Sequence, residues 1–197
     1  MKRSKSVNLI KIKNANISNV DKVVFTVPLP NSESVFMSSN VCDSEDELYG
    51  VVIVDSKKFL ELWRADPQGI HAELSNGSPK TWPLDYKYKD AEVGFADGEV
   101  NPVPLANVSL NTVEKANVSY KFLNFGKKIN YEVINYIAFT NGLTRTIWLL
   151  TQGCDTFPVL CNISSAKKLF DLGAAKNTLF YTQSEISKLP KLYRSYE

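Results

Sequence analysis

Histidine is almost absent from the sequence: the 197 residues include only His71. A Ser-His-Asp or Cys-His catalytic arrangement would have to use this residue. His71 lies in the turn-rich stretch DPQGIHAELSNG, where nothing nearby supplies a nucleophile together with an orienting carboxylate. We therefore interpret it as a solvated loop side chain, and we expect neither triad chemistry nor a zinc site.

Cysteine and long apolar runs are also scarce. The three cysteines, Cys42, Cys154 and Cys161, cannot all pair, and their spacing fits no metal-binding pattern. No stretch approaches the ~20 apolar residues that a membrane helix needs. The basic N-terminus lacks the apolar segment of a signal peptide. We expect a cytoplasmic protein with reduced thiols and no membrane insertion.

An excess of charge of either sign is missing as well. The formal net charge is +2, so bulk charge argues neither for nor against nucleic acid, and a DNA-binding surface would need local clustering. Hydrophobic residues make up 44% of the chain and aromatic residues 11%, which is ample for a packed core. The length suits one domain.

The order of apolar segments predicts an α/β (α+β) fold with a small mixed sheet and flanking helices. YGVVIV reads as a buried strand, and KKFLELWRAD reads as the helix that follows it, capped by Asp55 and Ser56. Phe59 and Trp63 fall on one face of that helix. VINYIAF is the best central strand, and TRTIWLLTQ is a compact buried helix that ends at Gly153.

Other segments are less regular. NSESVFMSSNVCDSEDE indicates a loop with a weak extended piece, and the segment from 68 to 98 indicates a short edge strand or a mobile surface loop. We expect an N-terminal strand and polar loop extension over 1–48 and a core over 49–163. A C-terminal helical segment over 164–197 would pack on the same domain.

The turn FTNGLTRTIWLL places one arginine, Arg145, at the start of a buried helix. The first turn of a helix has unsatisfied N–H groups, and the helix dipole adds positive potential there. Gly142 lets a ligand approach the backbone closely, and Asn141, Thr144 and Thr146 add short polar groups. The guanidinium matches phosphate oxygens, so these residues predict an anion pocket, although an ordinary turn with a solvated arginine would look similar.

INYIAFTNGLTRTIWLLTQGCDTFPVLCN resembles the strand, Gly-x-x-Arg turn and helix of the ParB/sulfiredoxin superfamily. Together with VVIVDSKKFLELW and NPVPLANV, it resembles more narrowly the plasmid fertility-inhibition factors. The resemblance covers roughly residues 49–163. The turn has Leu143 where sulfiredoxins carry their reactive cysteine, and it has a single arginine where partition ParB proteins have several, so neither of those activities is expected.

The resemblance implies a ParB/sulfiredoxin-like fold in a plasmid-encoded factor that blocks export of another element's DNA by a type IV secretion channel. It implies ATPase and DNase activities, with Gly142 and Arg145 holding the nucleotide phosphates. ATP and Mg²⁺ are therefore the expected cofactors. The expected partners are DNA and either the secretion coupling protein or the transferred nucleoprotein.

Hydrolysis would need a carboxylate to position water or hold the metal. Glu99, which leads into NPVPLANVSL, and Glu132, which precedes VINYIAF, are our candidates, although both also suit a solvated surface. Lys121, Lys127 and Lys128 alternate with aromatic residues, as in proteins that hold a nucleic-acid backbone and also in ordinary amphipathic strands. The alternative hypotheses are a non-catalytic inhibitor that binds the secretion machinery and a simple DNA-binding domain.

Overall fold

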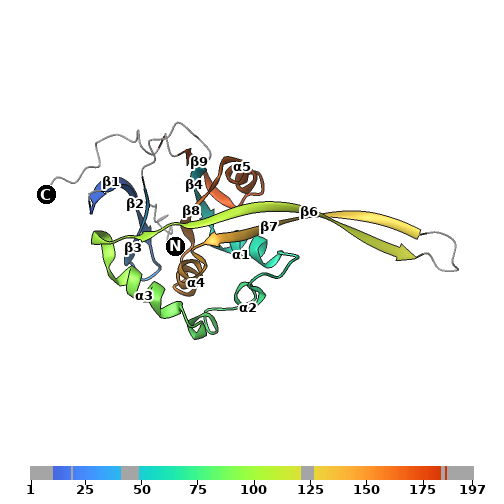
Figure 1. Ribbon diagram of the computed structural model, residues 1–197, viewed down its shortest axis with the longest axis horizontal. Coiled ribbons are helices and arrows are strands. Elements are labelled where there is room, and N and C mark those ends of the chain that lie inside the picture. Colours follow the sequence, from blue (N-terminus) through green and yellow to red (C-terminus); the bar gives the residue numbers. More distant parts are fainter. Residues whose placement is uncertain (1–10, 19, 41–48, 121–126, 183–184, 186–197) are drawn as a thin grey trace, which may run out of the picture.

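The computed structural model describes residues 11–18, 20–40, 49–120, 127–182 and 185. Two sheets and several short helices enclose one hydrophobic core, and one long β-hairpin projects away from it (Figure 1). The predicted α+β class is confirmed, with two mixed sheets where we expected one.

The first sheet contains most of the described part of the N-terminal segment. Its strand order is β1-β2-β3-β5, with β5 parallel to β3 and the other pairs antiparallel. Phe25 and Met37 of this sheet are fully buried and belong to the same core cluster as the rest of the protein. Residues 34–40 thus form a core strand where the sequence indicated mainly a loop. The strands are β1 (Lys11–Ile17), β2 (Val20–Pro28), β3 (Ser34–Asn40) and β5 (Val103–Pro104).

The second sheet is the centre of the fold and has the order β7-β6-β8-β4-β9. Strand β6 runs parallel to β8, whereas the remaining pairs are antiparallel. A strand, β9, follows the helix near residue 170, where we expected a wholly helical C-terminal segment; residues 183–184 and 186–197 lie outside the described part. The strands are β4 (Tyr49–Asp55), β6 (Ala106–Tyr120), β7 (Lys127–Asn141), β8 (Thr156–Asn162) and β9 (Ala175–Thr182).

Turns and short helices occupy the region from 68 to 98, so the edge strand that was one of our two expectations there is wrong. Tyr88, Ala91 and Phe95 are buried at helical spacing, and the ring of Phe95 stacks on Trp148 with centroids 4.2 Å apart. This packing holds the helix that contains Tyr88, Ala91 and Phe95 against the buried helix that follows the Arg145 turn. The helices are α1 (Ser56–Arg64), α2 (Ala72–Ser75), η1 (Trp82–Leu84), α3 (Tyr88–Ala96), η2 (Gly98–Val100), α4 (Leu143–Thr151) and α5 (Ile163–Asp171).

Helix α1 begins and packs as its sequence predicts. The Asp55 side chain accepts hydrogen bonds from the backbone N–H groups of Lys57 and Lys58, each at 3.0 Å. The rings of Phe59 and Trp63 meet Phe139 edge to face, at centroid distances of 5.9 and 5.0 Å. These contacts hold the C-terminal end of β7 against α1 and thereby orient the turn that follows β7.

Cys161 of β8 gives a direct test of this core. Its side chain is fully buried, and burial raises the pKa of the thiol to about 12. Because the thiolate is the reactive species, we expect iodoacetamide at pH 8 to label Cys161 at least about 100-fold more slowly in the native protein than in urea. Mass spectrometry of the Cys161 peptide measures both rates, and similar rates would show that β8 opens readily. Cys42 lies outside the described residues.

Candidate functional site

A cavity of about 420 Å³ lies at the turn between β7 and α4. Three segments form its wall: one face of α3, the approach to β5, and the turn with the start of α4. We call it the Arg145 pocket. Its lining residues are Lys87, Asp90, Ala91, Gly94, Asn101, Pro102, Val103, Pro104, Asn141, Gly142, Leu143, Thr144 and Arg145.

Arg145 is a partly buried cation of this pocket. Its Nη2 atom lies 3.5 Å from the Leu105 carbonyl oxygen and 3.5 Å from Asn141 Oδ1, at the outer limit of hydrogen bonding. Its Nε atom is buried without a hydrogen-bond partner, and among the described residues no carboxylate forms an ion pair with it. Burial lowers the pKa of the guanidinium, although arginine keeps its charge at neutral pH. A partly desolvated cation without a counter-ion favours an anionic ligand.

Gly142 brings the turn against β6. It adopts φ 88° and ψ 13°, in the left-handed region that glycine tolerates best. A Cβ at this position would lie 2.5 Å from Cα of Ala106 and 2.9 Å from Nη2 of Arg145. Gly142 is also the N-cap of α4, and no side chain caps the helix. Leu143, Thr144 and Arg145 of the first turn line the pocket, and this turn has no side-chain cap, which leaves its N–H groups available to an anion.

Helix α3 supplies two charged groups that the sequence did not reveal as site residues. Lys87 and Asp90 are both exposed and both line the pocket. Asp90 is the sole carboxylate among the lining residues that the structure describes. We missed them because TWPLDYKYKD alternates aromatic and charged residues like a strand. The helical spacing of the buried Tyr88, Ala91 and Phe95 was the signal that identifies α3.

The two carboxylates that we predicted lie elsewhere. Glu99 is in η2, forms an ion pair with Lys13 of β1, and is not among the pocket residues. Glu132 lies on β7 opposite Lys115 and accepts a hydrogen bond from Asn117 Nδ2 at 3.0 Å. Nine residue steps of extended strand lead from Glu132 to Asn141, a distance of about 30 Å. The structure therefore does not bring Glu132 and Arg145 together.

The remaining predicted residues divide between the pocket and other positions. Asn141, Gly142 and Thr144 line the pocket together with Arg145. Thr146 does not: it is buried, and its Oγ1 donates a hydrogen bond to the Gly142 carbonyl oxygen at 3.1 Å. Its hydroxyl is already used within α4.

Two of the three predicted DNA-binding lysines belong to the far end of the β6–β7 hairpin. Lys127 and Lys128 begin β7, and their backbone pairs with the last residues of β6. Lys121 lies outside the described residues. The start of β7 lies at the end of the hairpin that points away from α4 (Figure 1). DNA contact by these lysines therefore stays a prediction about a second surface.

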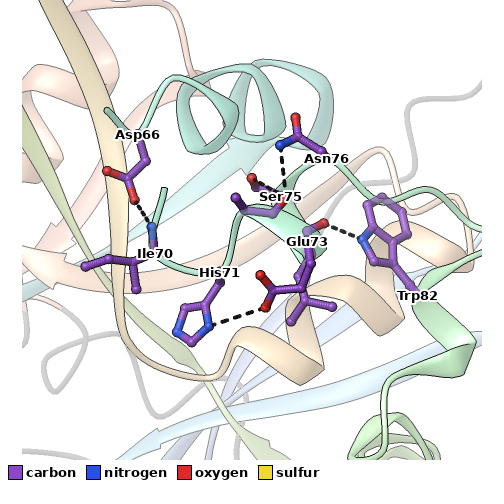
Figure 2. Close-up of polar contacts among 9 residues, drawn as sticks. Asp66, Ile70, His71, Glu73, Ser75, Asn76 and Trp82 are labelled. Carbon is purple, nitrogen blue, oxygen red and sulfur yellow. Dashed lines mark hydrogen bonds and ion pairs between the residues drawn. The ribbon is translucent and has the colours of Figure 1, made fainter. Parts of the chain in front are cut away.

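His71 occupies the loop that the sequence indicates (Figure 2). It adopts a left-handed conformation with φ 62°, is exposed, and its Nδ1 lies 4.0 Å from Oε1 of Glu73. Other polar contacts hold this loop in place. The backbone N–H of Ile70 donates a hydrogen bond to the Asp66 carboxylate at 3.2 Å, and Trp82 Nε1 donates one to the Leu74 carbonyl oxygen at 2.7 Å. These hydrogen bonds stabilise the loop conformation.

Two kinds of feature are missing from the described part of the chain. Among those residues, no group of three or more histidine, cysteine, aspartate and glutamate side chains is placed to hold a metal ion. Within the same ranges, no helix is long and apolar enough to cross a membrane. A preassembled metal cage is therefore not seen in this part of the protein.

Comparison with known proteins points to one family. The family model described as plasmid fertility inhibition factor matches residues 51–174. Protein osa of Shigella flexneri is 30% identical over 142 residues, which are 71% of this chain but only 62% of that protein. The crystal structure of an oncogenic suppression activity protein, a plasmid fertility inhibition factor in its gold(I) cyanide derivative, matches with a TM-score of 0.64. That match covers 95% of this chain and 88% of the other at 24% identity, which shows a shared fold.

Proposed function

The chain belongs to the plasmid fertility inhibition factors, and from that premise we propose that it blocks conjugative transfer of another element's DNA through a type IV secretion channel. We further propose that it binds ATP in the Arg145 pocket and hydrolyses both ATP and DNA. Its partners would be DNA and either the coupling protein of the channel or the transferred nucleoprotein, and it would act in the cytoplasm of the donor cell.

The observation that carries this proposal is the state of Arg145. Its guanidinium is partly buried, has only two long hydrogen bonds, and is not neutralised by a carboxylate of the described residues. A phosphate group would supply the missing negative charge and two acceptor oxygens in a matching geometry. The cavity of about 420 Å³ falls within the range of small-molecule sites, roughly 300–1,000 Å³.

The other lining groups suit a nucleoside triphosphate. The amides of Leu143, Thr144 and Arg145, at the start of α4, would donate to phosphate oxygens. Lys87 adds a second cation from α3. Because the positive groups come from two separate elements, they can contact successive phosphates of one chain.

Asp90 is the best-placed carboxylate for hydrolysis. It lines the same cavity as Arg145, whereas Glu99 is paired with Lys13 and Glu132 lies far along the hairpin. Magnesium commonly binds through one or two carboxylates together with substrate phosphates, so a single aspartate is sufficient for an ion that arrives with the nucleotide. When bound, the ion would neutralise phosphate charge, while Asp90 orients water in the pocket.

Calorimetric titration with Mg-ATP tests the proposal. We expect Arg145→Ala to weaken binding about 10- to 100-fold, because a hydrogen bond to a charged group contributes about 1.5–3 kcal/mol. Arg145→Lys keeps the charge but loses the planar guanidinium. Its affinity for Mg-ATP should lie between those of the wild type and Arg145→Ala. Lys89→Ala, an exposed residue of α3 outside the pocket lining, is the matched control and should bind like the wild type.

ATP hydrolysis and plasmid nicking are then measured on the same highly purified preparations. Loss of both activities in a folded Arg145→Ala protein would support a shared phosphate site. Equal ATP affinity of the wild type and Arg145→Ala would mean that the nucleotide binds at another site. Equal plasmid nicking by the two proteins would mean that a contaminant or a second site cleaves the DNA.

One observation favours a second candidate, the non-catalytic inhibitor. Among the described residues that line the pocket, Asp90 is the only carboxylate, and the two carboxylates suggested by the sequence lie outside it. In this case the pocket would hold a ligand without turnover, and inhibition would come from binding the secretion machinery. Wild-type protein that blocks transfer, binds ATP and releases no phosphate would identify this alternative.

A further inference from the structure

One side of the Arg145 pocket is a proline-rich segment with few backbone donors. Residues 102–105, which we call the wall segment, contribute Pro102, Val103 and Pro104 to the lining. Proline has no backbone N–H, so neither of the two prolines can donate a hydrogen bond to a neighbouring strand. Within the wall segment, only Val103 and Leu105 keep a backbone donor. The position of the segment therefore depends on what the adjacent strand β3 offers to it.

Ser38 of β3 holds the wall segment at both ends. Its Oγ donates a hydrogen bond to the Pro102 carbonyl oxygen at 3.2 Å. Its own carbonyl oxygen accepts a hydrogen bond from the Leu105 N–H at 2.9 Å. Between these two contacts β3 and β5 pair in parallel, with Met37 opposite Val103. One residue of the first sheet thus contacts both the first and the last residue of the wall segment.

The Ser38 hydroxyl lies where water does not reach. Ser38 is only 4% exposed, and both Pro102 and Leu105 are buried. A buried carbonyl oxygen that loses its donor is not compensated by a hydrogen bond to water. Removal of the hydroxyl takes a donor away from the Pro102 carbonyl oxygen, so we expect the wall segment to shift.

The wall segment also ends at a contact of Arg145. The Leu105 carbonyl oxygen lies 3.5 Å from Arg145 Nη2, and the Leu105 N–H is the group that donates to Ser38. Leu105 therefore lies between the serine and the guanidinium. A shift of the wall segment would change both the shape of the cavity and the surroundings of the guanidinium.

We propose that Ser38 is a positioning residue of the Arg145 pocket. It holds the wall segment, and through Leu105 the guanidinium, in the arrangement that receives a phosphate-bearing ligand. This role rests on the proposed function of the pocket, and it extends the site to the first sheet. The family match begins at residue 51, so Ser38 precedes the matched part of the chain.

Calorimetric titration of Ser38→Ala with Mg-ATP tests this role. We expect the Kd to rise about 2- to 10-fold, because the net contribution of one neutral hydrogen bond corresponds to such a factor. Ser38→Cys replaces the hydroxyl by a weak S–H donor and should show a smaller rise. This milder variant also serves if Ser38→Ala does not fold.

Ser56→Ala is the matched control. Ser56 is a buried serine whose Oγ donates to the Cys154 carbonyl oxygen, and it does not line the pocket. Its removal costs a buried hydrogen bond elsewhere in the core, so the free energy of unfolding should fall as in Ser38→Ala. The affinity for Mg-ATP should stay at the wild-type value. A residue with a merely structural role would behave like Ser56.

Labelling of Arg145 by phenylglyoxal is a second measurement, and it needs no nucleotide. Phenylglyoxal modifies arginine side chains, and mass spectrometry of each peptide gives the rate. We expect Arg145 to react about 2-fold or more faster in Ser38→Ala, because loss of one hydrogen bond makes local opening of the wall segment easier. Arg64 donates to the Ser75 and Gly77 carbonyl oxygens and is the internal reference, with an unchanged rate.

The two measurements separate the role of Ser38 from the proposed function. In a wild-type protein that binds Mg-ATP, an unchanged affinity of Ser38→Ala, or an equal loss of affinity in Ser56→Ala, would overturn the positioning role. A wild-type protein that binds no Mg-ATP would overturn the proposed function instead. The labelling rate then decides: faster labelling of Arg145 in Ser38→Ala alone supports the positioning role, and equal rates in all three proteins overturn it.

Discussion

An Asp90→Asn variant should hydrolyse ATP at least about 100-fold more slowly than the wild type, because a positioned carboxylate contributes about 100- to 10,000-fold in general acid–base catalysis. The change keeps the shape of the side chain and removes its charge. Binding of ATP should persist, because Lys87 and Arg145, the positive groups among the residues that line the pocket, are unchanged.

The separation of binding from turnover is the informative result. Calorimetric titration gives the affinity, and phosphate release at saturating Mg-ATP gives the rate. Glu92→Gln is the control: Glu92 is an exposed residue of the same helix that does not line the pocket. It should behave like the wild type in both measurements.

An unchanged rate of ATP hydrolysis in Asp90→Asn would show that this carboxylate takes no part in the reaction. The predicted carboxylates Glu99 and Glu132 would then be tested by the same substitution to glutamine. Loss of activity in Glu99→Gln would mean that the Lys13 ion pair opens and that the N-terminal sheet moves toward the pocket.

Local signals in the sequence were sufficient for α1 and for the turn before α4. A cap, an apolar face and a glycine act within a few residues of one another, so Asp55 and Phe59 predicted α1 and Gly142 predicted the start of α4. The pocket residues at the turn followed from the same reasoning, since they belong to one short segment.

Long-range packing decided the features that the sequence did not reveal. Helix α3 is held by the stacking of Phe95 on Trp148, more than fifty residues away, so local alternation of aromatic and charged residues misled us. The carboxylate of the pocket was missed for the same reason, because Asp90 lies far from Arg145 in sequence. Glu99 seemed better placed only because it is near a recognised segment.

The β6–β7 hairpin shows a second limit of sequence reasoning. VINYIAF was predicted as a central strand, yet its strand forms one edge of the sheet and extends from Lys127 to Asn141. An alternating apolar pattern indicates that one face is covered, but it does not say whether the cover comes from the same chain. The outer part of the β6–β7 hairpin alternates in the same way and has this ambiguity.

Gly142→Ala should destabilise the protein strongly. The new Cβ would overlap Ala106, whose Cα and Cβ would lie 2.5 and 2.8 Å away, and the left-handed φ of 88° would add backbone strain. We expect the free energy of unfolding to fall by about 3–5 kcal/mol, because overpacking and backbone strain are among the causes of large losses of stability. Urea denaturation with an unchanged m value measures it.

Gly173→Ala separates the two causes. Gly173 has a similar φ of 67°, but an added Cβ would meet nothing within 4 Å, so only the backbone term of about 1 kcal/mol applies. The excess loss in Gly142→Ala therefore reports the contact between the turn and β6. Because the same Cβ would lie 2.9 Å from Nη2 of Arg145, any folded Gly142→Ala protein should also bind ATP more weakly. Equal destabilisation by the two variants would mean that the turn can move away from β6 at little cost, and that Gly142 does not hold Arg145 in place.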